Sequence, residues 1–226
     1  MILSSTIISQ FELFKALDKP SLERVTTLMR PKFVEKDQYI ISAGSDNADV
    51  FFLITGQVLV CYFAQNGKQV NFENLQPGTM FGELAAIDDK GRSSDCITVS
   101  DCQLAVLSKD VFWQLVHEFP QVREYVLIRL AQMVRFNMRR VYEFTAFTVP
   151  QRIRFELLRL ASESSSPDGP IRIKRLPTHE EIAGRISTHR EAVSREVNSL
   201  IARGLISSDS SGYLIHDVVA MSDTKS

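Results

Sequence analysis

The chain has 226 residues, of which 44% are apolar and 23% are charged, and its formal net charge at pH 7 is −1. These values describe a folded globular chain and exclude fibrous and disordered classes. No apolar run is long enough to cross a bilayer, and no basic segment followed by an apolar one opens the chain. We therefore expect no membrane span and no signal peptide, and we expect a cytoplasmic protein.

The cysteines argue against a metal centre. Cys61, Cys96 and Cys102 are odd in number and show no CxxC or Cys/His ligand spacing. This pattern is typical of buried free thiols in a reducing compartment. We expect no metal ligands, and the pattern disfavours a metal, haem or iron–sulfur sensor.

The first half of the chain changes from helical to strand patterning. Apolar residues recur at helical spacing from Phe11 to Leu28, interrupted by Lys19-Pro20. From Lys32 to Leu107 short runs rich in Val, Ile, Phe and Tyr alternate with turn signals, of which Asn66-Gly67 is the strongest for a hairpin. The predicted strands are Tyr39–Ile41, Val50–Ile54, Gln57–Phe63, Gln69–Leu75, Asp95–Val99 and Gln103–Leu107. This succession predicts an antiparallel barrel or sandwich.

The segment from Val122 to Phe147 contains no Gly or Pro and predicts an unusually long helix. Its heptad positions hold Leu127, Val134 and Val141 on one side and Leu130, Asn137 and Phe144 on the other. A helix with this seam is predicted to pair with a second copy; packing of the stripe on the barrel is the alternative. Asn137 is the polar member, which destabilises a seam unless it fixes the register or touches a polar group such as a ligand.

A new domain is predicted after that helix, because Thr148 and Gln151 form a capping-box pattern around Pro150. The helix that follows runs to Ser162, and Ile171–Lys174 alternates like a short strand.

Two closely spaced helices then follow. Thr178 with Glu181 predicts the start of one helix, Glu180–Ile186, and Thr188 with Glu191 predicts the start of a second that ends at Gly204. Hydrophobic runs on either side of Ser207–Gly212 predict a wing. Together these elements predict a winged helix-turn-helix.

The second of these two helices carries side chains suited to reading DNA bases. Arg donors fork onto guanine in the major groove, and a Glu accepts from cytosine. In the alternative interpretation Glu191 only caps its helix or pairs with Arg195 on a solvated face. The position on the second helix favours base readout. The predicted DNA-binding residues are Thr178, Thr188, His189, Arg190, Glu191, Ser194 and Arg195.

A second polar constellation lies between the predicted strands. A helical turn beginning at Gly82 directs free backbone N–H groups at an anion, and Arg92 adds forked donors that suit a phosphate. Glu83 is able to accept from a ribose hydroxyl. A hairpin with an Arg–Glu surface pair is the alternative that the spacing leaves open.

These residues resemble the phosphate-binding cassette of cyclic-nucleotide-binding domains, and the whole chain resembles the CRP/FNR regulators, especially the cyclic AMP receptor protein branch. The resemblance implies an α+β chain with a β-roll or jelly-roll cyclic-nucleotide-binding domain over residues 1–118. A dimerisation helix and hinge over residues 119–147 and a C-terminal winged helix-turn-helix over residues 148–226 would follow. The hinge itself is expected around Phe144–Pro150.

The resemblance also implies a function. The chain would be a homodimeric transcription regulator and not an enzyme, with cyclic AMP or cyclic GMP as its allosteric ligand and no other cofactor. Its partners would be double-stranded DNA, with palindromic TGTGA-like sites, and RNA polymerase. The alternative is a regulator of the same fold that is ligand-independent or responds to another signal.

Carried over residue by residue, the resemblance assigns the ribose to Glu83 and the cyclic phosphate to Arg92 and Ser93. Asn137 and Met138 replace the pair that the family presents to the base, and an Asn amide pairs with either adenine or guanine. The base selected is therefore open. Met133 stands where the family carries an Arg. The full set of predicted ligand-binding residues is Gly82, Glu83, Leu84, Arg92, Ser93, Asn137 and Met138.

Overall fold

The computed structural model describes residues 2–63, 69–164, 171–173, 177–209 and 212–222. The predicted Asn66-Gly67 turn lies outside these residues, as does the last residue of the predicted strand Ile171–Lys174. The chain divides into two compact units, residues 1–134 and residues 135–226. The dividing point falls within a single long helix.

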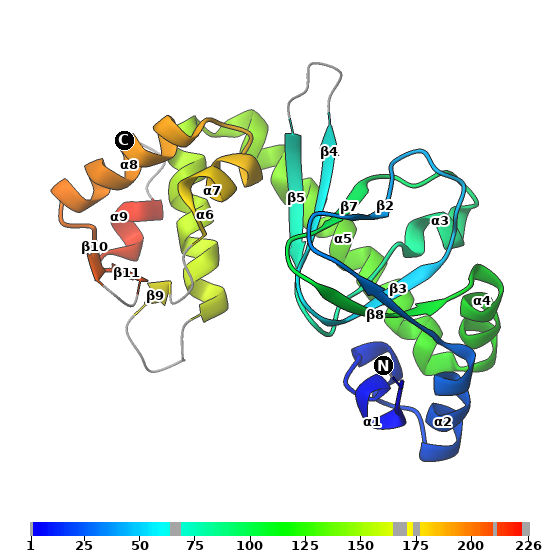
Figure 1. Cartoon of the computed structure of the whole chain (residues 1–226). Helices are drawn as coiled ribbons and strands as arrows, with labels where there is room; N and C mark the ends of the chain where they lie inside the picture. Colours follow the sequence, from blue (N-terminus) through cyan, green and yellow to red (C-terminus); the bar gives the residue numbers. More distant parts are fainter. Residues whose placement is uncertain (1, 64–68, 165–170, 174–176, 210–211, 223–226) are drawn as a thin grey trace. The chain divides into compact units, whose positions relative to one another are not determined.

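The first unit is built on two four-stranded antiparallel sheets (Figure 1), with strand orders β1-β8-β3-β6 and β2-β7-β4-β5. The strands are β1 (Arg30–Val34), β2 (Tyr39–Ile41), β3 (Val50–Thr55), β4 (Val58–Phe63), β5 (Gln69–Leu75), β6 (Met80–Phe81), β7 (Asp95–Thr98) and β8 (Cys102–Leu107). Alternate side chains of β3 enter the space between the sheets: Phe51 and Leu53 pack there with Val58 and Cys96 of the opposite sheet. The predicted jelly-roll class is confirmed.

Two strands were absent from the prediction. Four of the five residues of β1 are exposed, so it gives no apolar run, and β6 has only two residues.

Helices cover the outer face of the sheet that contains β3 and β8 (Figure 1). They are α1 (Ser5–Ile8), a 3₁₀ turn (Glu12–Phe14), α2 (Lys19–Leu28), α4 (Lys109–Glu118) and the start of α5 (Pro120–Ala146). Phe52 is fully buried beneath them and contacts Phe11 edge-on, with ring centroids 5.2 Å apart. The predicted helix from Phe11 is therefore a 3₁₀ turn followed by α2, which Asp18 caps. α3 (Glu83–Asp88) lies between β6 and β7 in the chain.

The predicted long helix is present as α5, and much of its apolar stripe is uncovered. Leu127, Val134 and Val141 are 62%, 58% and 63% exposed, whereas Leu130 packs against the core of the first unit. Packing on the barrel thus accounts for Leu130, whereas the other three side chains remain mostly exposed in the described structure. None of the described helices is at once long and apolar enough to span a bilayer.

The second unit contains the predicted winged helix-turn-helix. Its elements are α6 (Val149–Ser164), β9 (Arg172–Ile173), α7 (His179–Arg185), α8 (Arg190–Ala202), β10 (Ile206–Asp209), β11 (Gly212–Ile215) and α9 (Val218–Ser222). β11 pairs with both β10 and β9 in an antiparallel sheet. Ile153, Leu157, Val193 and Val197 lie in the core between the helices. The expected domain limits at residues 118 and 147 remain predictions.

The two helix starts in this unit behave differently. Thr178 and Glu181 form the predicted capping box of α7. The prediction for α8 was wrong, because His189 is the N-cap residue and no side chain caps the helix. The Thr188 N–H instead donates to the Ala183 carbonyl at 2.9 Å, which continues the turn between the helices.

Candidate functional site

The predicted cassette begins at a glycine that no other residue replaces without strain. Gly82 precedes α3 with a φ of +80°, in the left-handed region. A Cβ at this position would lie 2.8 Å from the Arg92 Nη1 atom and 3.2 Å from the Asp49 carbonyl oxygen. The close approach of this backbone to Arg92 therefore requires glycine.

Arg92 is buried inside the jelly roll, with 5% of its surface exposed. Its Nη1 donates to the Gly82 carbonyl at 2.6 Å, and its Nη2 donates to Asn47 Oδ1 and to the Asp49 carbonyl, both at 2.7 Å. The buried Nε has no hydrogen-bond partner in the described structure. Burial lowers the pKa of Arg92, but an arginine remains charged at any physiological pH. An oriented, charged group with an unused donor is suited to an anion.

Glu83 is also buried, and its partner is a residue that the sequence did not indicate. Arg129 of α5 donates from Nε to Glu83 Oε1 at 3.0 Å and from Nη2 to the Met80 carbonyl at 2.7 Å. Burial acts to lower the pKa of Arg129, but Glu83, together with Tyr125 and Glu73, outweighs it and the pKa is raised. Arg129 lies four residues before Met133, so it occupies the same helix face one turn earlier. That spacing is the signal that could have identified it.

The one tryptophan of the chain contacts α3, the helix that begins with Glu83. The indole N–H of Trp113 donates to the Ala86 carbonyl of α3 at 2.7 Å. Its fluorescence is therefore expected to respond when α3 or its surroundings change.

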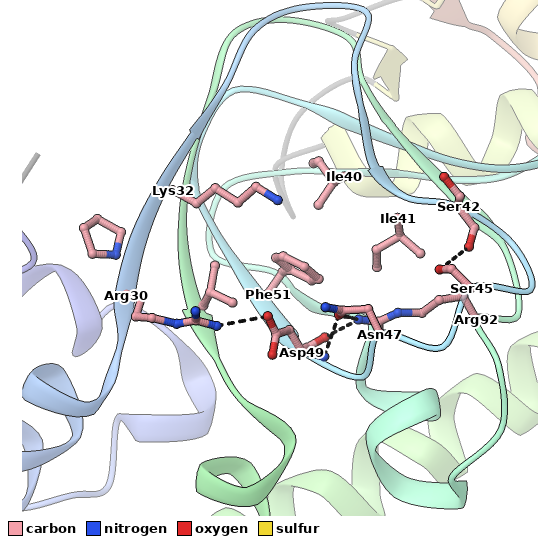
Figure 2. Close-up of a pocket in the computed structure, with 12 residues that line it drawn as sticks. Arg30, Lys32, Ile40, Ile41, Ser42, Ser45, Asn47, Asp49, Phe51 and Arg92 are labelled. Atoms are coloured by element: carbon pink, nitrogen blue, oxygen red, sulfur yellow. Dashed lines mark hydrogen bonds and ion pairs between the residues drawn. The ribbon is translucent and has the colours of Figure 1, made fainter.

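A cavity of about 440 Å³ opens beside Arg92 (Figure 2). Arg30 and Lys32 of β1 line it together with Asn47 and Phe51, and Arg30 pairs with Asp49 at 3.1 Å. Lys32 Nζ and the Arg92 guanidinium lie 5.5 and 5.7 Å from the centre of the Phe51 ring. Of the predicted ligand-binding residues, this electropositive cavity contains only Arg92.

The remaining predicted ligand residues are dispersed. Leu84 is half-buried, while Ser93, Asn137 and Met138 are exposed. Asn137 and Met138 belong to the second unit, so their approach to a ligand bound at Arg92 stays a prediction. In the described ranges no His, Cys, Asp and Glu side chains gather into a possible metal site.

The N-terminal end of α8 presents exposed polar side chains. Arg190, Glu191 and Arg195 are exposed, and none of their side chains forms a hydrogen bond or ion pair with another described residue. Neither structural alternative is realised: Glu191 does not cap α8, and it does not pair with Arg195. Ser194 differs from them, because its hydroxyl is 2.8 Å from His179 Nδ1 and the residue is half-buried.

Two family models match the chain. A cyclic nucleotide-binding domain matches residues 31–119, and a Crp-like helix-turn-helix domain matches residues 151–224. The first match contains α3 and Arg92, and the second contains α7 and α8.

Relatives match over nearly the whole chain. A CRP-like cAMP-activated global transcriptional regulator of Mycobacterium tuberculosis is 24% identical over 212 residues, which cover 93% of this chain and 95% of that protein. A mutant of CooA from Carboxydothermus hydrogenoformans has a TM-score of 0.79 at 18% identity, covering 93% of this chain and 92% of the other. The c-di-GMP responsive regulator CLP of Xanthomonas campestris has a TM-score of 0.72, also at 18% identity, over 88% of this chain and 100% of the other.

Proposed function

Because the chain belongs to the CRP/FNR superfamily of transcription regulators, which are not enzymes, we propose that a cyclic nucleotide controls its binding to DNA. The proposed ligand is cyclic AMP, with cyclic GMP as the second choice. The proposed target is a palindrome of TGTGA-like half-sites bound by a homodimer. The single observation that carries the ligand assignment is the buried Arg92 with its unused Nε donor.

The ligand assignment is supported by the way the cassette is arranged. Gly82 and three hydrogen bonds orient Arg92 before any ligand binds, so an incoming phosphate meets a fixed donor. Glu83, beside it, offers a carboxylate oxygen to a ribose hydroxyl while Arg129 holds the other side of the group. The names of several relatives state that cAMP activates them, which favours cyclic AMP here.

The ligand is tested by titrating cyclic AMP, cyclic GMP and cyclic di-GMP against the full chain while following Trp113 fluorescence. We expect saturable binding of cyclic AMP and a large loss of affinity in Arg92→Lys, because a lysine lacks the Nε donor and the two terminal nitrogens that hold the side chain in place. Arg24→Lys, an exposed position of α2, is the matched control and should bind as the unmodified protein does. Absence of binding, or equal binding by Arg92→Lys, would refute the assignment and favour a regulator that responds to another signal.

The DNA assignment rests on the free side chains at the start of α8. Arg190→Ala should weaken the free energy of DNA binding by about 1–3 kcal/mol at a site with the matched guanine. This loss should vanish at sites where that base pair is changed. Fluorescence anisotropy with a TGTGA palindrome and single-base variants measures this difference. A uniform loss at all sequences would instead indicate a phosphate contact.

The dimer assignment rests on the uncovered stripe of α5. Val134 is 58% exposed, and a charged residue there should break a seam between two copies. We expect Val134→Asp to shift the protein from dimer to monomer in analytical ultracentrifugation. Val219→Asp, at a 79% exposed position of α9, is the control and should leave the mass unchanged. A monomeric unmodified protein would contradict the proposal.

A further inference from the structure

Two acidic side chains are buried where α5, α6 and α7 meet within the second unit. Glu156 of α6 is 1% exposed, and Glu143 of α5 is 7% exposed. Charged groups are seldom buried to this extent unless they are paired. We call Glu156, Glu143 and the arginines that pair with them the Glu156 cluster.

Arginines from all three helices contribute to this cluster. Arg159 of α6 lies 3.0 Å from both carboxylate oxygens of Glu143 and also pairs with Glu156. Arg185, the last residue of α7, lies 3.2 Å from Glu156 Oε1, and Arg140 of α5 lies 3.9 Å from Glu156 Oε2. Glu156 is thus shared by side chains that belong to α5, α6 and α7.

The cluster extends to the C-terminal end of α7. The last carbonyl groups of a helix have no partner within it, so donors from elsewhere fix the position of that end. Arg140 donates to the Arg185 carbonyl, and Arg152 of α6 donates to the Ile186 carbonyl at 2.8 Å. The next residue is Ser187, in the left-handed region with a φ of +53°, and α8 begins three residues later. The donors therefore fix the turn that sets the direction of α8.

The connection between α5 and α6 is also firmly packed. The Phe147 and Phe155 rings stack with centroids 4.7 Å apart and planes 12° apart. The guanidinium groups of Arg140 and Arg152 lie 4.8 and 5.1 Å from the centre of the Phe144 ring. These contacts span the region expected to be a hinge, Phe144–Pro150. In this conformation, bending there would require a buried ion-pair cluster and an aromatic stack to open together.

Stability does not explain such a cluster. Desolvation of buried ion pairs consumes most of their attraction, so apolar side chains of similar size stabilise a protein equally well. Buried charges are best supported as devices that select one arrangement of helices. Burial and the neighbouring Arg159 both lower the pKa of Arg140, which shows that the arginines are crowded as well as paired.

We propose that Glu156 is a positioning residue for DNA recognition. It joins the last turns of α5 to α7, so a displacement of α5 is carried to α7 and the start of α8 instead of being absorbed between α5 and α6. Arg140 is the contact through which α5 acts on the end of α7. The proposal relies on the proposed function only in that a ligand supplies the displacement.

The test compares Glu156→Gln with Glu196→Gln in the full-length protein. Glu196 is a matched control because it forms a partly buried ion pair with Arg154, 3.5 Å away, which joins α6 to α8 and does not include α5. Three quantities are measured: the affinity for cyclic AMP from Trp113 fluorescence, the affinity for a TGTGA palindrome with and without cyclic AMP, and hydrogen exchange of α7.

For Glu156→Gln we expect unchanged affinity for cyclic AMP but a loss of about tenfold in the ratio of DNA affinities with and without ligand, within the 5–150-fold range of typical allosteric coupling. Glu196→Gln should keep that ratio, even if it weakens DNA binding under both conditions. Equal behaviour of the two variants would show a structural role alone and overturn the proposal.

Two further outcomes have defined meanings. If Glu156→Gln does not fold, Arg140→Met takes its place. Removing Arg140 still leaves Glu156 paired with Arg159 and Arg185. If the unmodified protein does not respond to cyclic AMP, the proposed function fails, and hydrogen exchange decides the positioning role. Faster exchange of the α7 amides in Arg140→Met but not in Glu196→Gln supports that role, and unchanged exchange refutes it.

Discussion

Breaking the ion pair between Arg129 and Glu83 by removing one partner should destabilise the protein far more than breaking another pair of the same length in the same unit. Arg129 Nε lies 3.0 Å from Glu83, and Arg30 lies 3.1 Å from Asp49. The side chains of the first pair are 22% and 4% exposed, whereas Arg30 is 67% exposed. Removing one partner of a buried pair costs about 3–5 kcal/mol, because it leaves an uncompensated charge, whereas an exposed pair contributes about 0–1 kcal/mol.

We therefore expect Arg129→Met to lower the free energy of unfolding by several times the effect of Arg30→Met. The assay is urea unfolding of the first unit, followed by Trp113 fluorescence. Adding Glu83→Gln to Arg129→Met should restore part of the loss, since the buried charge is then removed as well. The reasoning is refuted if Arg129→Met costs no more than Arg30→Met, or if the double variant is as unstable as Arg129→Met alone.

Further predictions concern the thiols and the backbone. Burial raises the pKa of Cys61 to about 11 and that of Cys96 to about 12, so iodoacetamide at pH 8 should alkylate them slowly until urea unfolds the chain. As the pH rises above the ordinary thiol pKa of 9.0, these thiols ionise in the unfolded chain before they ionise in the folded protein. The free energy of unfolding should therefore fall, and a flat profile from pH 9 to 11 would contradict this. Ser187→Gly should stabilise the second unit by about 1 kcal/mol in thermal unfolding, because glycine adopts a φ of +53° without strain; a lower melting temperature would show that the serine side chain is needed.

Sequence patterns predicted the features that depend on residues close together in the chain. The absence of Gly and Pro predicted the long helix, the Thr178–Glu181 pair predicted the start of α7, and short apolar runs between turn signals predicted most strands. The prediction that Thr188 caps α8 was wrong. The Thr188 N–H forms a hydrogen bond within the tight turn around Ser187, and the helix begins at Arg190. A capping pattern shows only that a hydrogen bond is possible. At Thr188 the neighbouring turn prevents that hydrogen bond from forming.

The interactions that the sequence could not give are those between distant segments. Arg129 and Glu83 are far apart in the chain, and only the folded position of α5 brings them together. The same holds for Glu156, whose arginine partners lie on three helices. A carboxylate or arginine in a helix reads as a solvated surface residue until the packing of its face is known.

The net charge of the side chains around Arg92 should influence which phosphates the cassette binds. Glu83 compensates Arg129 and Asp49 compensates Arg30, which leaves Arg92 and Lys32, on the wall of the cavity, as cations without a carboxylate ion pair among the described residues. A cyclic phosphodiester carries one negative charge, whereas a terminal phosphate carries about 1.5 to 2 near pH 7, and a surplus charge is unfavourable where water is excluded. Under the proposed function, Lys32 therefore sets how well the site tolerates the extra negative charge of a linear nucleotide.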